Sequence, residues 1–116
     1  MKTGSQGQLL RIFVGETDKV NGKPLYEQIV LEARRLNLAG ATVLRGIMGY
    51  GANSRLHTAK ILRLSEDMPV VIEIVDKDEN IARIMTYLDT HVKEGLITLE
   101  NVNVIKYTAS DKGEKS

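Results

Sequence analysis

The eight residues Pro69-Val70-Val71-Ile72-Glu73-Ile74-Val75-Asp76 decide the fold that we predict for this chain. They are rich in β-branched apolar side chains, and the proline stands only at the start, where a strand tolerates it. Successive side chains of a strand lie on opposite faces of the sheet. Val70, Ile72 and Ile74 make one purely apolar face, and Val71, Glu73 and Val75 make a second face that is mostly apolar. We therefore predict a strand over residues 69–75 with both faces covered.

The residues before this strand predict two more strands and a helix. Leu9 to Val14 is a β-branched and aromatic run that ends at Gly15, so we predict the first strand there. Pro24 suits the first turn of a helix, and Gly40 suits its end. Between them, apolar residues recur at helical spacing, namely Leu25, Ile29, Ala33 and Leu36. Ala41 to Leu44 is predicted as the second strand.

The residues after the central strand predict a second helix and a last strand. Asp76 and Asp78 are candidate N-caps, and an apolar helical face then continues as far as Gly95. Leu96 to Tyr107 is strand-like, but its apolar residues change phase at Glu100-Asn101. We expect a β-bulge or a break at that point.

The resulting order, βαββαβ, predicts a ferredoxin-like α+β fold. In this arrangement a four-stranded antiparallel sheet carries two helices on one face. We place the domain at residues 8–107. Residues 1–7 and 108–116 are polar, and we expect them to be flexible tails because they have little apolar surface to bury.

The side of the sheet away from the helices is also predicted to be mostly apolar. On the first and third strands it would carry Leu9, Arg11, Phe13, Val71, Glu73 and Val75. A sheet face in water is normally polar, so we expect another subunit to cover it. If these strands pair, Arg11 and Glu73 are neighbours, and we predict a structural ion pair between them rather than a catalytic role.

Composition excludes several classes of function. The 116 residues suit one domain, and the absence of cysteine removes disulfides, thiolate metal ligands and cysteine nucleophiles. A net charge of +1 and few aromatic residues argue against a nucleic-acid-binding protein. Because no export signal or membrane-spanning apolar run is visible, we expect a cytoplasmic protein without direct membrane insertion.

A glycine-rich segment, Arg45-Gly46-Ile47-Met48-Gly49-Tyr50-Gly51, follows the second strand. Glycine permits sharp turns and brings backbone N–H groups close to a ligand, and Arg45, Arg55 and His57 are near enough in sequence to meet negative charge. The order of the glycines is not the G-x-G-x-x-G of dinucleotide-binding folds. From the spacing alone, a phosphate site and an ordinary glycine-rich turn both stay open.

Several separated motifs together resemble the PII-like signalling proteins. They are Gly22-Lys23-Pro24-Leu25, the glycine-rich segment and the strand that begins at Pro69, and they follow one another in the order of that family. The chain resembles most closely an uncharacterised PII-like subfamily known as a domain of unknown function. The resemblance covers roughly Leu9 to Tyr107.

This resemblance implies a regulatory homotrimer that binds an adenine nucleotide, as a ligand, in the cleft between subunits. The loop after the second strand would contact a partner protein, for which a membrane transporter or channel is the implied class. The chain has no clear equivalent of the glycine-rich segment with a lysine that follows the second helix in PII proteins, so we expect AMP or ADP rather than ATP. The implied nucleotide-binding residues are Arg45, Gly46, Met48, Gly49, Tyr50, Gly51, Arg55 and His57.

Each of these side chains also has a structural alternative. Arg45 would form an ion pair at the strand end, and Arg55 would be a solvated loop residue. His57 would be exposed, or would act as a pH-responsive switch. Met48 and Tyr50 would pack at the loop base or at a subunit junction, or would flank an adenine ring.

Two other functions are compatible with the same architecture. A metal-tolerance trimer of the CutA type is disfavoured by the lack of soft ligands, and we predict no metal site. An acylphosphatase-type enzyme would need a phosphate-binding loop with an arginine after the first strand. This chain has the acidic segment Gly15-Glu16-Thr17-Asp18 there, so we expect neither catalytic residues nor enzymatic activity.

Overall fold

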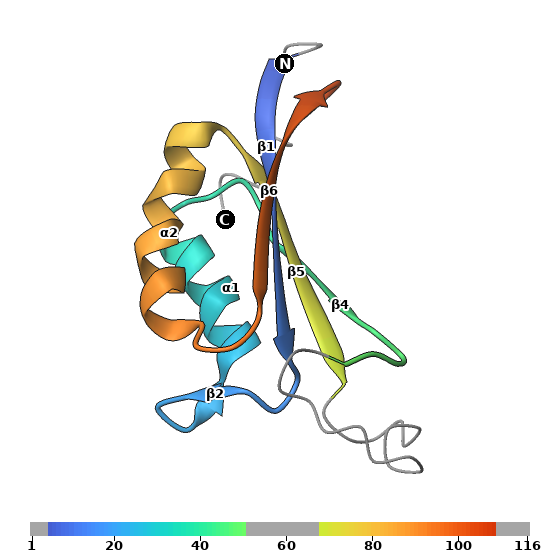
Figure 1. Cartoon of the computed structure of the whole chain (residues 1–116). Helices are drawn as coiled ribbons and strands as arrows, with labels where there is room; N and C mark the ends of the chain where they lie inside the picture. Colours follow the sequence, from blue (N-terminus) through green and yellow to red (C-terminus); the bar gives the residue numbers. More distant parts are fainter. Residues whose placement is uncertain (1–4, 51–67, 109–116) are drawn as a thin grey trace.

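A four-stranded antiparallel sheet with both helices on one side forms the fold of this computed structural model (Figure 1). The structure describes residues 5–50 and 68–108. Its elements in chain order are β1 (Ser5–Gly15), β2 (Lys19–Val20), β3 (Lys23–Pro24), α1 (Leu25–Arg35), β4 (Thr42–Arg45), β5 (Pro69–Asp76), α2 (Asp78–His91) and β6 (Leu96–Val104). The strand order β4-β5-β1-β6 confirms the predicted ferredoxin-like fold.

A short hairpin formed by β2 and β3 lies between β1 and α1, and we did not predict it. Its turn residues Asn21 and Gly22 have φ values of 53° and 79°. An Asn-Gly pair with two positive φ angles is typical of a tight two-residue hairpin turn. The Leu25 N–H donates to the Asp18 carbonyl oxygen at 2.8 Å, so the hairpin leads directly into α1.

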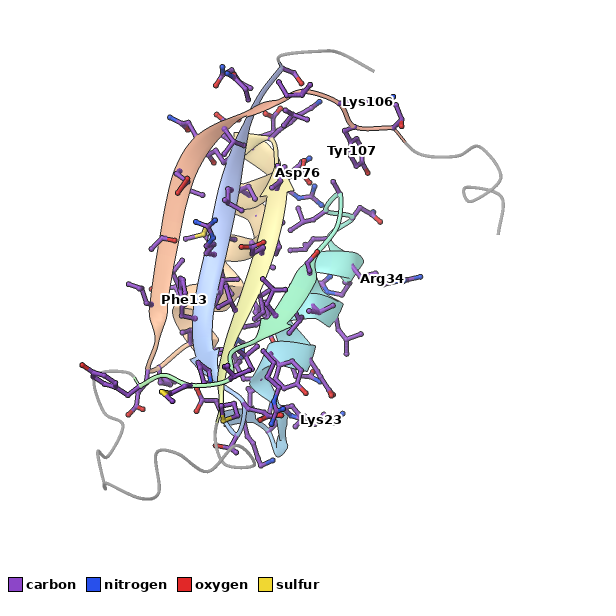
Figure 2. The ribbon with its side chains drawn as sticks, turned by 90° about the vertical axis from the view of Figure 1, so that its right-hand side faces the viewer. Phe13, Lys23, Arg34, Asp76, Lys106 and Tyr107 are labelled. Carbon is purple, nitrogen blue, oxygen red and sulfur yellow. The ribbon has the colours of Figure 1, made fainter. Side chains whose placement is uncertain are left out.

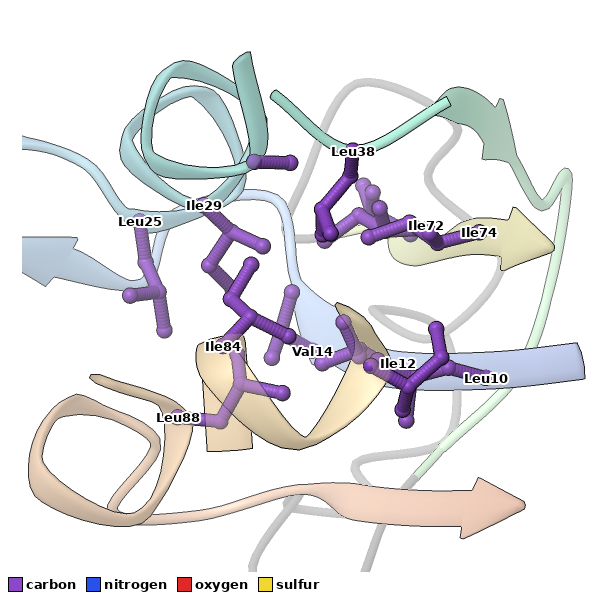
Figure 3. Packing of buried hydrophobic residues seen from close by; sticks show 13 residues of the cluster. Leu10, Ile12, Val14, Leu25, Ile29, Leu38, Ile72, Ile74, Ile84 and Leu88 are labelled. Carbon is purple, nitrogen blue, oxygen red and sulfur yellow. The ribbon is translucent and has the colours of Figure 1, made fainter. Parts of the chain in front are cut away.

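The core lies between the sheet and the helices (Figure 3). The register pairs Leu10 with Ile74 and Ile12 with Ile72, and all four side chains are buried, as the alternation predicts. Each helix adds one apolar stripe: Leu25, Ile29 and Ala33 from α1, and Ile81, Ile84 and Leu88 from α2. By the usual transfer scale, each large side chain buried here contributes about 1.5–3 kcal/mol to folding.

The predicted bulge in the last strand is wrong. Pairing between β1 and β6 runs without interruption from Phe13↔Leu96 to Ser5↔Val104. The apolar phase changes because the helix-facing side of this ribbon is apolar only as far as Leu99. Beyond it that side is polar, with the Gln6 side chain donating to Asn103 at 2.8 Å, and the valines of this end lie on the opposite face.

β1 begins at Ser5, so Ser5–Gly7 belongs to the sheet although we predicted a flexible tail up to residue 7. Gly7 is buried, and a Cβ atom there would lie 3.0 Å from Val104 Cγ2. After β6, the Tyr107 hydroxyl donates to the Ala39 carbonyl oxygen at 3.3 Å, and Figure 2 shows Tyr107 beyond the end of the sheet. The ordered domain therefore extends further toward the N-terminus than the sequence indicated.

Asp76 has a structural role, but it is not the N-cap that we predicted. The N-cap of α2 is Lys77, whose side chain makes no capping hydrogen bond, and Asp78 is the first residue of the helix. The Asp76 carboxylate accepts the Ala39 N–H at 2.8 Å, the Lys77 N–H at 2.7 Å and the Asn80 amide at 2.9 Å. Asp76 thus joins the α1–β4 connection to the start of α2.

Candidate functional site

The segment Arg45 to Tyr50, which we call the loop base, leaves the sheet where β4 and β1 end and β5 begins. The Gly46 N–H donates to the Pro69 carbonyl oxygen at 2.7 Å. The Glu16 N–H donates to the Met68 carbonyl oxygen at 2.8 Å. Backbone hydrogen bonds to the start of β5 therefore hold both neighbouring strand ends.

Two glycines of the loop base lie against Pro69. A Cβ atom on Gly46 would lie 2.7 Å from Pro69 Cγ, and one on Gly49 would lie 3.0 Å from the same atom. Neither glycine has a positive φ, which among the described glycines occurs only at Gly22 and Gly95. The close approach of the loop base to its own chain therefore accounts for both glycines without a ligand. The sequence offered no signal for this contact, because Pro69 is 20 residues or more away.

Arg45 forms an ion pair, which was the structural alternative for this residue. Its Nε and Nη2 atoms each lie 3.1 Å from Glu16 Oε1. The side chains are 53% and 30% exposed, respectively. Since Arg45 pairs with the buried Val70 in the sheet, it starts on the same face as the helices. The pair joins the ends of β4 and β1 across β5.

Large apolar side chains of the loop base point away from the core. Ile47 is 80% exposed, Met48 61% and Tyr50 71%. Met48 and Tyr50 thus do not pack into the domain, which leaves a subunit junction or a ligand as their predicted contact. Gly51, Arg55 and His57, the other predicted site residues, lie outside the residues that the structure describes.

The sheet face opposite the helices, which we call the open face, carries a network of three charges. Arg11 Nε lies 3.0 Å from Glu73 Oε2, which confirms the predicted ion pair. Arg11 Nη1 lies 3.5 Å from Glu100 Oε2. We did not predict the contact with Glu100. This residue of β6 pairs with Leu9 of β1, so it is a diagonal neighbour of Arg11.

Apolar side chains surround this network on the open face. Figure 2 shows the open face, with Phe13 on β1. The strand register places there Leu9, Phe13, Leu44, Val71, Val75, Leu96, Val102 and Val104. No helix of residues 5–50 and 68–108 covers them (Figure 1). This is the composition that we predicted for a face covered by another subunit.

Interactions on the helices shift the pKa values of two side chains. A side-chain hydrogen bond from Arg35 lowers the pKa of Glu32, and burial raises the pKa of Tyr87. Within the described ranges, no three His, Cys, Asp or Glu residues are grouped so that they could hold a metal ion. Neither α1 nor α2, the only helices in those ranges, is long and apolar enough to cross a membrane.

Comparison with known proteins identifies the family. Residues 7–104 match the family model DUF190, described as "Uncharacterized ACR, COG1993". The chain is 42% identical to a UPF0166 protein of Aquifex aeolicus over 98 residues, which cover 84% of this chain and 92% of the relative. It is 38% identical to the UPF0166 protein MJ1524 of Methanocaldococcus jannaschii, over 87% of this chain and 94% of that protein.

Several solved structures that superpose on this chain are PII-like proteins. A putative PII-like signaling protein from Thermus thermophilus superposes with a TM-score of 0.61 at 20% identity and 98% coverage of both chains. CPII, a nitrogen regulatory PII-like protein from Thiomonas intermedia bound to ADP, AMP and bicarbonate, gives a TM-score of 0.63 at 13% identity, covering 90% of this chain and 98% of its own. The chain therefore belongs to the DUF190 (UPF0166) family, an uncharacterised subfamily with the fold of PII-like signalling proteins.

Proposed function

We propose that this protein is a PII-like regulator that binds an adenine nucleotide between subunits and contacts a partner protein through the loop after β4. The observation that carries the proposal is the loop base. A guanidinium group and exposed apolar side chains meet there at one end of the sheet. In CPII, which has this fold, ADP and AMP are bound.

The loop base has the chemistry for both parts of a nucleotide. Arg45 and backbone N–H groups would meet phosphate, since a guanidinium binds phosphate oxygens through two parallel hydrogen bonds. Met48 and Tyr50 offer exposed apolar surface for an adenine ring. Gly51, Arg55 and His57 complete the proposed set, and AMP or ADP is the expected ligand.

The open face supports the assembly into a homotrimer that the nucleotide cleft requires. Its apolar side chains are numerous, and its central Arg11 is already paired with carboxylates, so covering it leaves that guanidinium neutralised. A Phe13→Glu substitution should dissociate the trimer, as measured by light scattering, because it buries an unpaired charge. Trimers that persist in this variant would show that another surface holds the subunits together.

A signalling role requires no catalysed reaction. The four similar proteins named above are called UPF0166 or PII-like proteins, and none of these names is that of an enzyme. At the end of β1, where an acylphosphatase would cradle phosphate, the Gly15 N–H donates to Asp18 Oδ2 at 2.9 Å. An internal carboxylate therefore already holds that N–H group. We propose a cytoplasmic protein whose loop binds a membrane transporter or channel when the nucleotide selects one loop state.

Thermal unfolding with AMP, ADP and ATP tests the nucleotide site. A ligand at about one hundred times its Kd stabilises the folded state by about 2.7 kcal/mol, and we expect this for AMP or ADP. Arg45→Gln should weaken the effect. Arg34→Gln, which removes an exposed arginine from α1, is the matched control and should leave it unchanged. If no nucleotide raises the Tm of the unmodified protein, the proposed ligand is wrong.

A further inference from the structure

The Glu16 carboxylate lies on the edge of Arg45 that a phosphate would use. The Nε and Nη2 atoms of Arg45 both point to Glu16 Oε1, each at 3.1 Å. These two N–H groups form the fork with which arginine binds carboxylates and phosphates bidentately. A side chain of the same subunit therefore occupies the edge of Arg45 to which an anion would bind.

The backbone holds both partners of this ion pair in position. The Glu16 N–H is bonded to the Met68 carbonyl oxygen at 2.8 Å, and Gly46, which follows Arg45, is bonded to Pro69 at 2.7 Å. The two acceptor residues, Met68 and Pro69, are consecutive, and β5 begins at Pro69. The pair therefore belongs to the folded domain itself.

We propose that Glu16 is an internal competitor of the ligand phosphate for Arg45. The inference rests on the proposed function, in which Arg45 contacts a nucleotide phosphate. A phosphate that binds the same edge must displace the carboxylate, and the negative charge of Glu16 repels it during its approach. Glu16 thus lowers the affinity of the site for phosphate-bearing ligands.

Displacement of Glu16 would also change contacts at a distance from the ligand. The ion pair links the end of β4, where the loop base begins, to the end of β1, which leads through Asp18 into the β2–β3 hairpin (Figure 1). When phosphate replaces Glu16, this link between the two strand ends is lost. The occupied and empty states then differ at the β1–β2 turn as well as at the loop base.

The expected effect is small because both side chains are partly exposed. Solvent and salt screen ion pairs of this kind, so their net contribution in solution is small. Glu16→Gln keeps the shape of the side chain and removes its charge. We expect it to bind AMP or ADP about two- to five-fold more tightly than the unmodified protein at low ionic strength.

Isothermal titration calorimetry with AMP and ADP tests the inference on the unmodified protein and on Glu16→Gln, Arg45→Gln and Glu32→Gln. The last variant is the charge-matched control, because it neutralises a carboxylate paired with Arg35 on α1. Tighter binding by Glu16→Gln, weaker binding by Arg45→Gln and unchanged binding by the control support the competition.

Three other results would overturn it and can be told apart. Equal or weaker binding by Glu16→Gln, with the unmodified protein still binding, would mean that Glu16 positions Arg45 or is irrelevant, and the proposed function would stand. Binding by none of the four proteins would remove the proposed function and the competition together. Unchanged binding by Arg45→Gln would show that the phosphate does not contact this arginine.

Discussion

Among the glycines in residues 5–50 and 68–108, Gly95, in the connection between α2 and β6, should tolerate substitution least. Its φ is +153°, a value that side-chain-bearing residues rarely adopt. A Cβ atom there would lie 2.5 Å from the carbonyl oxygen of Phe13, which is backbone of the central strand β1. Substitution by alanine therefore brings both conformational strain and a steric clash that no side-chain rotation can relieve.

The cost of Gly95→Ala follows from these two contributions. Strain from an unfavourable φ costs about 1–3 kcal/mol, and forcing extra volume into a packed site costs about 1–3 kcal/mol. The expected loss is about 4 kcal/mol, a large part of the 5–15 kcal/mol typical of a domain. Because 1 kcal/mol shifts the Tm of such a domain by about 4–8 °C, Tm should fall by roughly 15 °C or more.

Two other glycines separate the contributions. Gly22 has a positive φ of 79° but open space around its Cβ position, so Gly22→Ala should show the strain alone. Gly40 has open space and no positive φ, so Gly40→Ala should be neutral or slightly stabilising. Urea denaturation followed by far-UV circular dichroism, at one protein concentration, gives the free energies of unfolding. A Gly95→Ala variant within 0.5 kcal/mol of the unmodified protein, a margin of roughly the usual surface-substitution effect, would refute the reasoning.

Three further predictions concern the loop base, the Asp76 junction and the helix layer. Gly46→Ala should destabilise the domain by about 1–3 kcal/mol because its Cβ would lie 2.7 Å from Pro69 Cγ; adding Pro69→Ala should restore part of that loss in urea denaturation, and no restoration would mean that Pro69 is not the obstacle. Asp76→Asn should destabilise the domain by about 1–3 kcal/mol, because each carboxylate oxygen accepts a backbone N–H and one of them is replaced by an NH2 donor. An unchanged Tm would show that these hydrogen bonds do not stabilise the contact between the α1–β4 connection and α2. The pKa of Glu32 is lowered in the folded protein, so its pair with Arg35 should contribute fully to stability above pH 4.5, the usual value, and lose its contribution as pH falls through the lowered pKa. Glu32→Gln should make the free energy of unfolding fall less steeply between about pH 5 and 3, and equal slopes would argue against this account.

The local sequence pattern was sufficient to predict the strands and helices that bury an apolar face. The alternation in residues 69–75 and the helical spacing from Leu25 and from Ile81 each match a buried side of the same core. The ion pair between Arg11 and Glu73 was also predictable, because strand pairing sets which residues are opposite one another. Where the apolar residues of a strand or helix follow a single period, the sequence predicts which side of that element is buried.

The last strand shows where pattern was misleading. A change of apolar phase in residues 96–104 has two physical causes, a bulge or a change in which face is apolar along a regular strand. Only the register with β1 distinguishes them, and it is uninterrupted. The start of β1 was missed for a similar reason, since Ser5–Gly7 is polar and is held by pairing with β6 rather than by burial of its own side chains.

The amino-acid sequence was sufficient to predict the order of the four sheet strands and two helices, the two apolar faces of the core, and the family, because these depend on residue periodicity and on short motifs of adjacent residues. The surroundings of the candidate site depend on the tertiary structure. It brought Pro69 against Gly46 and Gly49, and it brought Glu16 onto Arg45. These contacts join residues at least 20 positions apart, and their geometry follows from how the ends of β1, β4 and β5 meet. The contacts of the glycine-rich segment are therefore set by the strand ends around it.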